Sequence, residues 1–385
     1  MLAATQNLEM KMTTKTPVDP NGLMEFSVVF TDRSLNHMSK SFQGVMTDIS
    51  SMLGEVYSAD EVALVPGGGT FAMEAVARQF GGGAHALIVR NGWFSYRWSQ
   101  IFEAGNFAAK TTVMKARQAG NDTRAPFAPA PIEDVVAAIR EAKPDVVFAP
   151  HVETSAGMIL PDDYLKAMSD AAHEVGALLV LDCIASGCIW VDMKATGVDV
   201  LISAPQKGWS ATPSAGLVMM SARAAARLAE TTSDSFSMDL KKWRAIMVAY
   251  EEGGHAYHLT MPTDGLRAFR DTMAETKDYG FEKLKAAQWD LGRKVRAILE
   301  AKGIKSVAAE GFQAPGVVVS YTDDPTVQNG SAFVAKGMQI AAVVPLQCDE
   351  PADFRTFRLG LFGLDKLYDV DGTVGRLTPV LDAVL

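Results

Sequence analysis

Residues 61–80 read EVALVPGGGTFAMEAVARQF, and this stretch decides the fold class. An apolar run, Glu61–Pro66, is followed by three glycines and then by a predicted helix over Phe71–Phe80. The apolar run does not alternate with polar residues, which is typical of a strand buried on both faces of a sheet. A buried strand that leads through a short turn into a helix is the repeating unit of a parallel α/β sheet.

The same unit recurs along the middle of the chain. Apolar runs predict six further strands, at His85–Arg90, Lys110–Lys115, Asp145–Pro150, Ala177–Asp182, Asp199–Ser203 and Ala215–Ser221. Helices are predicted at Pro131–Ala142 and Pro161–Glu174, where a proline and acidic residues open the first turn. The sequence therefore predicts an α/β fold with a large, doubly wound, mostly parallel seven-stranded sheet domain.

The pattern changes in the last third of the chain. Asp239–Gly303 is predicted to be largely helical, and it is followed by strands and helices at Gly316–Tyr321, Ser331–Gly337, Phe354–Phe362 and Val370–Val384. A chain of 385 residues exceeds the usual size of one domain. We expect an N-terminal segment (1–40), a large domain (41–280) and a smaller C-terminal α+β domain (281–385) that takes up part of the N-terminal segment.

Composition excludes several classes of partner. The formal net charge is −9 and no dense stretch of Lys or Arg occurs, which argues against nucleic-acid binding. No segment approaches the ~20 apolar residues of a membrane helix. Three cysteines indicate a reducing, cytoplasmic setting. His255 and His258 could share a helix face, but no Cys or acidic residue stands at zinc spacing, so no metal site is expected.

The glycine run at Gly67–Gly69 is the clearest local signal for binding. Glycines let backbone amides approach an anion, and the start of the following helix adds free N–H groups and a positive dipole end. The run predicts either a phosphate cradle or a plain strand-to-helix turn. It matches neither GxxxxGK[ST] nor GxGxxG, so it disfavours a nucleoside triphosphate and supports a dinucleotide only weakly.

Two charged residues follow other predicted strands at the same edge of the sheet. Asp182 closes the run LLVLD, where it acts either as a loop cap or as a partner for a pyridinium nitrogen. Lys207 follows the strand that ends at Ser203, where it is either a surface lysine or a partly desolvated amine that forms a Schiff base. The convergence of a phosphate cradle, an acid and an amine on one edge is more specific than any one of them.

With these residues the chain resembles fold-type I, class-V aminotransferases, near the alanine–glyoxylate, serine–pyruvate and 2-aminoethylphosphonate–pyruvate group. The resemblance runs from about Gly54 to the C-terminus and includes Asn91–Arg97, His151–Gly157 and Asp182–Ser186. It implies pyridoxal 5′-phosphate as a Schiff base on Lys207, with Asp182 on the ring nitrogen. The other cofactor residues that it implies are Gly68, Gly69, Thr70, Phe94, Thr154, Ile184 and Gln206, with Trp93 as the alternative to Phe94 for stacking on the ring.

Two further segments carry the resemblance. Tyr257–Pro262 resembles a segment that reaches the cofactor phosphate of a neighbouring subunit, which implies a homodimer in which Tyr257 and Thr260 serve the partner's site. Phe357–Gly360 resembles a strand whose arginine, here Arg358, binds the substrate α-carboxylate as a bidentate pair.

The resemblance implies transfer of an amino group from a small amino acid to a 2-oxo acid such as glyoxylate or pyruvate. An aminophosphonate or amino-sulfonate donor with pyruvate is a variant of this reaction. A cysteine desulfurase or another lyase on the same fold is the main alternative. A nicotinamide-dependent oxidoreductase is a weaker one, since the strand His85–Arg90 does not end in the acid that would hold a ribose.

Overall fold

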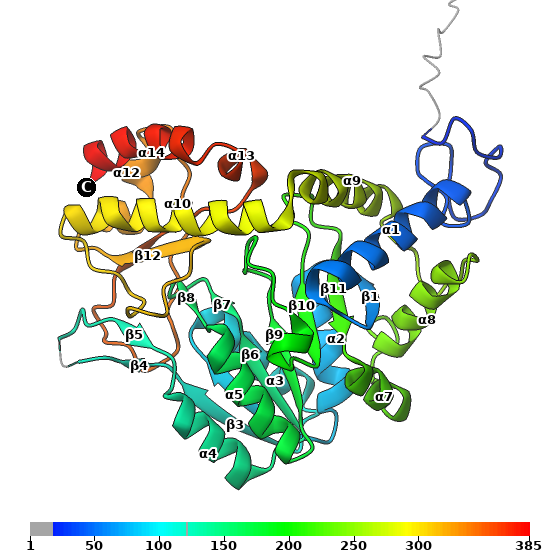
Figure 1. Ribbon diagram of the computed structural model, residues 1–385, viewed down its shortest axis with the longest axis horizontal. Helices are drawn as coiled ribbons and strands as arrows, with labels where there is room; N and C mark the ends of the chain where they lie inside the picture. The colour runs from blue at the N-terminus through cyan, green and yellow to red at the C-terminus, as the bar shows by residue number, and fades with distance from the viewer. Residues whose placement is uncertain (1–17, 121) are drawn as a thin grey trace, which may run out of the picture.

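A seven-stranded sheet forms the centre of the larger part of the molecule (Figure 1). The computed structural model describes residues 18–120 and 122–385, so residues 1–17 of the predicted N-terminal segment lie outside it. The strand order is β1-β11-β10-β9-β6-β2-β3, and β11 runs antiparallel to both of its neighbours while the other strands are parallel. The strands are β1 (Glu61–Pro66), β2 (His85–Arg90), β3 (Lys110–Lys115), β6 (Val146–Pro150), β9 (Leu178–Asp182), β10 (Val200–Ser203) and β11 (Ala215–Met220).

The predicted α/β sheet is confirmed, and each strand agrees with its predicted range to within one residue at either end. This agreement has a physical reason. All residues of β6, β9, β10 and β11 are buried, so these strands keep apolar side chains on both faces. The edge strand β3 is the exception, with exposed residues at its start.

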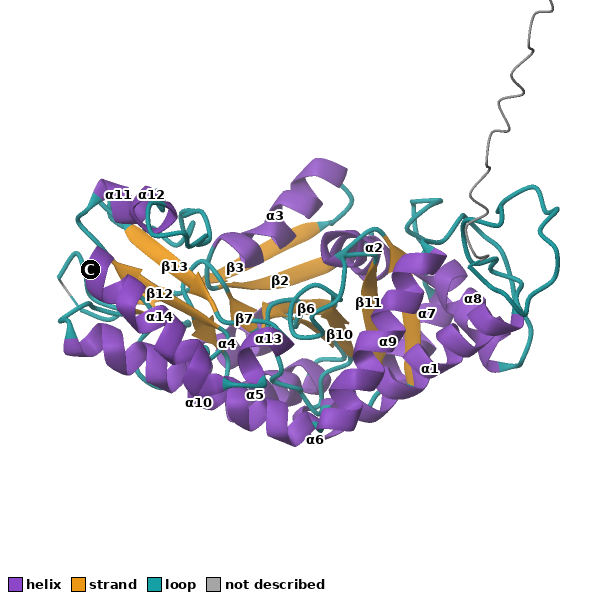
Figure 2. Ribbon diagram, turned by 90° about the horizontal axis from the view of Figure 1, so that it is seen from above, coloured by secondary structure: helices purple, strands orange, loops and turns teal. Residues whose placement is uncertain are grey.

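Helices cover both faces of the sheet, and Figure 2 shows α2 and α3 on one side and α5 on the other. The helices of this part are α1 (Lys40–Tyr57), α2 (Gly69–Gly81), α3 (Trp93–Gly105), α4 (Ile132–Ala142), α5 (Asp162–Glu174), α6 (Met193–Thr196), α7 (Ala222–Glu230), α8 (Leu240–Glu251) and α9 (Thr263–Tyr279). Helices α2, α4 and α5 were predicted from the sequence, whereas α1, α3 and α7 were not.

The long helix α10 (Phe281–Ala301) leads from α9 to the C-terminal part, where it runs beside α14 (Figure 1). The predicted strands and helices of this part are present, and α14 matches its predicted range while α12 is shorter than expected. The elements are β12 (Val317–Tyr321), β13 (Thr356–Gly360), α11 (Pro325–Gln328), α12 (Ser331–Val334), α13 (Leu364–Leu367) and α14 (Val370–Val384). Strands β12 and β13 pair antiparallel.

The predicted domain boundary near residue 280 stays a prediction. Gly280 joins α9 to α10 with a φ of 111°, a backbone angle that side chains with a Cβ rarely adopt. One expectation for this region is wrong: His255 and His258 do not share a helix face, because they lie in the non-helical stretch between α8 and α9. No helix in the described ranges is both long and apolar enough to cross a membrane.

Two short hairpins complete the described elements. Strands β4 (Arg117–Gln118) and β5 (Phe127–Ala128) pair beside the end of β3, and β7 (Val152–Glu153) pairs with β8 (Met158–Ile159) just after β6. The second hairpin matters for the site, because it begins where the central strand β6 leaves the sheet.

Candidate active site

Asp182 and Lys207 follow neighbouring strands at the same edge of the sheet. Asp182 is the last residue of β9, and in the register it lies opposite Ile202 of β10. Strand β10 ends one residue later, at Ser203, and Lys207 stands in the turn that follows. Because β9 and β10 are parallel, both side chains belong to the carboxyl edge of the sheet, where open α/β sheets bind ligands.

Two glycine contacts bring the loops of three strands together at this edge. A Cβ at Gly69, the first residue of α2, would lie 2.4 Å from Cδ1 of Ile184, so α2 begins directly against the loop after β9. A Cβ at Gly208 would lie 2.1 Å from the carbonyl oxygen of Gly187, so the loop after β10 also packs on the loop after β9. At Gly208 the neighbouring atom belongs to the backbone, so only glycine permits that contact. The two contacts bring together the start of α2, the loop after β9 and the loop after β10, which carry or adjoin the glycine turn, Asp182 and Lys207.

The glycine turn has the shape that an anion cradle requires. Gly67 has a φ of 119°, in the region that favours glycine, and it turns the chain from β1 toward α2. Above Gly68 there is open space, since a Cβ there would meet no atom within 4 Å. Thr70 lies in the first turn of α2, where backbone N–H groups and the helix dipole attract negative charge.

Asp182 is a buried carboxyl group, with only 7% of the residue exposed. Its Oδ1 accepts a hydrogen bond of 2.9 Å from the Ile184 backbone N–H. Burial raises the pKa of Asp182 to about 7, and the negative charge of Glu153 adds to this rise, whereas the Ile184 hydrogen bond and Arg97 oppose it. Such a carboxyl group becomes a stable carboxylate when a cation lies beside it.

Lys207 has the properties of a reactive amine rather than of a surface lysine. Burial is the main cause that lowers the pKa of Lys207, and the positive charge of Arg358 adds to it. Its Nζ lies 5.5 Å from the centroid of the Phe362 ring. A lysine in this environment is more often neutral than a solvated one, and the neutral amine is the nucleophile that attacks a carbonyl carbon.

Glu153 organises the start of α3 and is absent from the residues predicted for the site. Its carboxylate is fully buried and accepts five hydrogen bonds of 2.7–3.2 Å, from the Phe94 N–H and from the N–H and hydroxyl groups of Ser95 and Ser155. A Cβ at Gly92 would lie 2.1 Å from the Ser155 hydroxyl oxygen, so the contact needs a glycine. Glu153 thereby fixes where α3 begins and where Phe94 lies.

Arg358 is a buried arginine with no carboxylate partner within 4.0 Å in the described part of the chain. Its Nε donates 3.0 Å to the Ala342 carbonyl, which also accepts from Nη2, and its Nη1 lies 3.4 Å from the Thr154 carbonyl. Burial lowers the pKa of Arg358, while the charge of Glu153 opposes this. Backbone carbonyls hold the guanidinium in place but leave its charge unbalanced, which suits a carboxylate ligand.

The Phe94 ring lies near the guanidinium groups of two arginines. The guanidinium of Arg358 is 5.6 Å from the centroid of its ring, and that of Arg97 is 5.3 Å away. Arg97 is not among the residues predicted from the sequence for the site. Both arginines therefore share the aromatic ring that the family resemblance assigns to the cofactor.

Three predicted cofactor residues are not joined to this cluster by any hydrogen bond between described residues. Gln206 is exposed. Tyr257 is 54% exposed, and its hydroxyl group pairs only with that of Thr260, at 3.0 Å. Their assignment to the cofactor stays a prediction.

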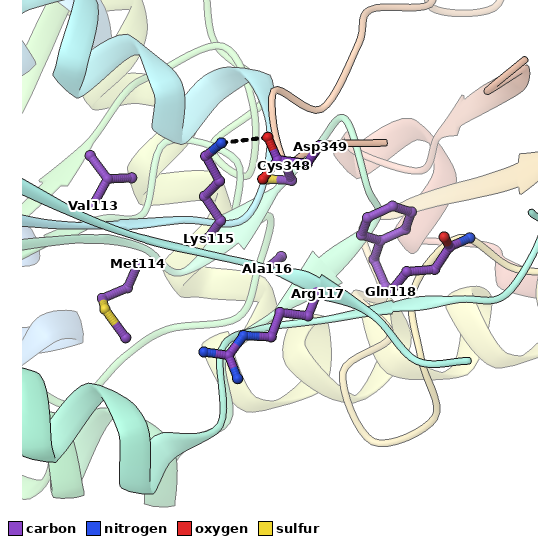
Figure 3. A pocket seen from close by; sticks show the side chains of 9 residues that line it. Val113, Met114, Lys115, Ala116, Arg117, Gln118, Cys348 and Asp349 are labelled. Atoms are coloured by element: carbon purple, nitrogen blue, oxygen red, sulfur yellow. Dashed lines mark hydrogen bonds and ion pairs between the residues drawn. The ribbon is translucent and has the colours of Figure 1, made fainter. Parts of the chain in front are cut away.

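Two pockets of the described structure lie away from this site. One, of about 430 Å³, lies beside edge strand β3, where Lys115 Nζ bonds Asp349 Oδ1 at 2.6 Å (Figure 3). The other, of about 620 Å³, lies between the β4–β5 hairpin and the end of α10. Neither lining includes Asp182 or Lys207. Over the described ranges, no group of three or more His, Cys, Asp and Glu side chains is placed to hold a metal ion.

With the geometry established, comparison with known proteins identifies the family. The model of the class-V aminotransferases matches residues 25–339. The chain belongs to this family. Accordingly it is a fold-type I transferase, an aminotransferase whose cofactor is pyridoxal 5′-phosphate.

The relatives agree with the family. A 2-aminoethylphosphonate–pyruvate transaminase from Paraburkholderia phymatum is 27% identical over 359 residues, which are 90% of this chain and 89% of that protein. Two solved structures share the fold. A subgroup IV aspartate aminotransferase from Thermus thermophilus has a TM-score of 0.74 at 24% identity and covers 91% of this chain and 93% of its own. An alanine–glyoxylate aminotransferase from Nostoc sp. has a TM-score of 0.73 at 23% identity, and the match covers 91% of this chain and 89% of that one.

The residues present fit this cofactor. The open space above Gly68 at the start of α2 suits a phosphate group. The buried Asp182 forms no salt bridge with a Lys or Arg of the described residues, and it matches a protonated ring nitrogen. The desolvated Lys207 offers the amine to which the aldehyde of the cofactor attaches.

Proposed function

We propose that this aminotransferase moves an amino group from a small amino donor to pyruvate or glyoxylate, with Lys207 attaching the cofactor. The observation that carries the proposal is that a buried acid and a desolvated amine follow neighbouring strands at one edge of the sheet, beside an open glycine turn. The names of the relatives support the acceptors, because a pyruvate transaminase and a glyoxylate aminotransferase are both similar to this chain.

The residues divide the work between them. When bound, the cofactor supplies an electron sink for the negative charge that develops at the α-carbon of the donor. Asp182 holds the proton on the ring nitrogen, which keeps that sink effective. Lys207 Nζ takes the proton from the α-carbon and returns it at C4′, and its lowered pKa makes the neutral base available. Arg358 binds the α-carboxylate through the guanidinium N–H groups that do not donate to these backbone carbonyls.

The absorption spectrum of the purified protein tests the cofactor site. The proposal is supported if the protein is yellow, if borohydride bleaches it, and if the reduced cofactor is then found attached to the peptide that contains Lys207. Attachment of the reduced cofactor to another lysine would overturn the role of Lys207.

Donor and acceptor are tested by a coupled screen. Alanine, serine, 2-aminoethylphosphonate and taurine are each offered with pyruvate and with glyoxylate. We expect one donor class to give a kcat/KM at least about tenfold above the others, since a single anionic group on Arg358 sets the orientation. Release of sulfide from cysteine without a 2-oxo acid would instead indicate a desulfurase.

The cysteines argue against that desulfurase alternative. All three are free and buried. Burial raises the pKa of the Cys188 and Cys348 thiols to about 12 and that of Cys183 well above its usual range. A desulfurase needs a mobile thiolate, and thiols in these environments stay protonated. The same free thiols support a proposed location in the cytoplasm.

We further propose that the enzyme works as a homodimer. Four large apolar side chains in the described N-terminal segment are 86–102% exposed: Leu23, Met24, Phe26 and Val28. Exposed apolar clusters of this kind mark interaction surfaces. A second copy that covers them would also give the exposed Tyr257 and Thr260 a site to serve, as the family resemblance implies. Sedimentation equilibrium tests the assembly, and a monomer at micromolar concentration would overturn it.

A further inference from the structure

Arg97 carries a positive charge that no salt bridge within the described residues balances, although Asp182 lies near enough for its carboxyl group to interact with it. It lies in the second turn of α3 and is partly exposed, and no Asp or Glu oxygen in that part of the chain is within 4.0 Å of it. Many other arginines form such pairs, for example Arg78 with Glu74 and Asp234. Among the described residues, the Arg97 side chain makes one hydrogen bond, from Nη1 to Thr70 Oγ1 at 3.1 Å. Arg97 is therefore attached to the glycine turn at the start of α2.

The glycine turn needs a cation that its own segment does not contain. Residues 65–72 read VPGGGTFA, without Lys or Arg. A bound phosphate monoester carries about −1.5 to −2 charge near neutral pH. The start of a helix offers only about +0.5. A phosphate in the turn would thus keep about one negative charge or more without a partner.

We infer that Arg97 is the cation that neutralises the phosphate of the cofactor at the glycine turn. The inference rests on the proposed placement of that phosphate above Gly68. Thr70 holds one arm of the guanidinium, while Nε and Nη2 make no hydrogen bond to the described protein atoms. These two donors form one edge of a planar fork, and such an edge matches two phosphate oxygens. The Phe94 ring, 5.3 Å from the guanidinium, limits where the fork can point.

Glu153 helps to position Arg97 by fixing the start of α3. It accepts hydrogen bonds from the N–H groups of Phe94 and Ser95, so it fixes the first turn of α3, which directly precedes Arg97. Thr70 and Arg97 come from different helices, and their contact depends on both helix starts being fixed at the same edge of the sheet. Arg97 is thus a binding residue for the cofactor, whereas Glu153 is a positioning residue.

The test compares two forms of the cofactor on the full chain after the cofactor has been removed. Pyridoxal 5′-phosphate and pyridoxal, which lacks the phosphate, are titrated separately against the wild type and Arg97→Gln. We expect Arg97→Gln to weaken the phosphorylated form about tenfold, the loss of one hydrogen-bonded charge partner, and to leave pyridoxal within about twofold. Arg97→Lys should recover part of the loss.

The control is Arg140→Gln, which removes an arginine of α4 that is paired with Glu174 on the surface. It should leave both affinities unchanged. In the loaded protein, the ³¹P resonance reports the charge of the phosphate directly. An adjacent cation favours the dianion, so we expect the pKa of the phosphate to be higher in Arg97→Gln than in the wild type.

Each contrary result has a distinct meaning. If the wild type binds both forms equally well, the placement of the phosphate at the glycine turn is wrong, and with it the site on which the inference rests. If the wild type prefers the phosphorylated form but Arg97→Gln keeps that preference, only the role of Arg97 is overturned. An equal loss of both forms would show a packing role, and a raised donor KM alone would assign Arg97 to the substrate.

Discussion

The carboxyl edge of the sheet and the N-terminal segment differ in how far contacts within one chain cover or pair their side chains. At the sheet edge, the buried carboxylate of Glu153 accepts five hydrogen bonds from within the chain. In the N-terminal segment, Leu23 and Phe26 expose 97% and 89% of their surface. We propose that the first region binds a small charged ligand and that a second copy of the chain covers the second region.

Replacing Lys207 tests the sheet edge with the largest expected effect. Lys207→Ala removes the amine that we propose to attach the cofactor and to move the proton. We expect kcat to fall about 10²- to 10⁴-fold or more, and the borohydride-sensitive absorption to disappear. Lys194→Ala, which removes a surface lysine paired with Asp60, is the control and should keep full activity. Retention of transamination by Lys207→Ala would refute the assignment.

The titration of Asp182 tests whether its burial is real. Its folded-state pKa of about 7 lies above the ordinary value, so the stability that Asp182 contributes is present at low pH and is lost as pH rises toward 7. Without cofactor, the free energy of unfolding of the wild type should fall relative to Asp182→Asn by up to about 4 kcal/mol between pH 4 and pH 8. Denaturant unfolding at several pH values measures this.

The cofactor should reverse that trend, because a positive ring nitrogen beside Asp182 favours the carboxylate. Loaded wild type should therefore exceed loaded Asp182→Asn in stability at pH 8. Parallel pH profiles of the two proteins without cofactor would show that Asp182 is solvated and that the site is more open than the structure indicates.

Glu153 tests whether the sheet edge depends on its internal hydrogen bonds. Glu153→Ala leaves several buried donors at the start of α3 without an acceptor, and we expect a loss of about 3 kcal/mol in the free energy of unfolding. Glu153→Gln keeps an acceptor and should lose less. The matched control is Glu133→Ala, an exposed residue in the first turn of α4. A loss below about 0.5 kcal/mol for Glu153→Ala would mean that α3 needs no such cap.

Replacing Phe26 tests the N-terminal segment, and its expected effect is the smallest. Because its side chain is exposed within one chain, Phe26→Ser should leave the unfolding of the isolated chain unchanged. If a second copy buries it, the replacement should weaken dimerisation by about 2 kcal/mol, measured as a shift in sedimentation equilibrium. Val334→Ser, at an exposed position of α12, is the control. An unchanged dimer would remove Phe26 from the interface.

The two regions also differ in how far the sequence predicts them. The strands were predictable because each is a short, wholly apolar run, and burial on both faces leaves that pattern in the sequence alone. Helix α3 was missed because its start has no Ser, Thr, Asp or Asn cap of its own. Its cap is Glu153, about sixty residues away in sequence, and no local pattern reports such a contact.

The sequence by itself determined the sheet and the types of side chain at the ends of its strands, since hydrophobic periodicity and glycine turns are local properties. It also placed Asp182 and Lys207 as candidates. Only the tertiary structure decided that the loops after β9 and β10 touch through Gly208 and Gly187, and that Arg97 meets Thr70. These contacts join segments distant in sequence, and they exist only after the strands have taken their order in the sheet.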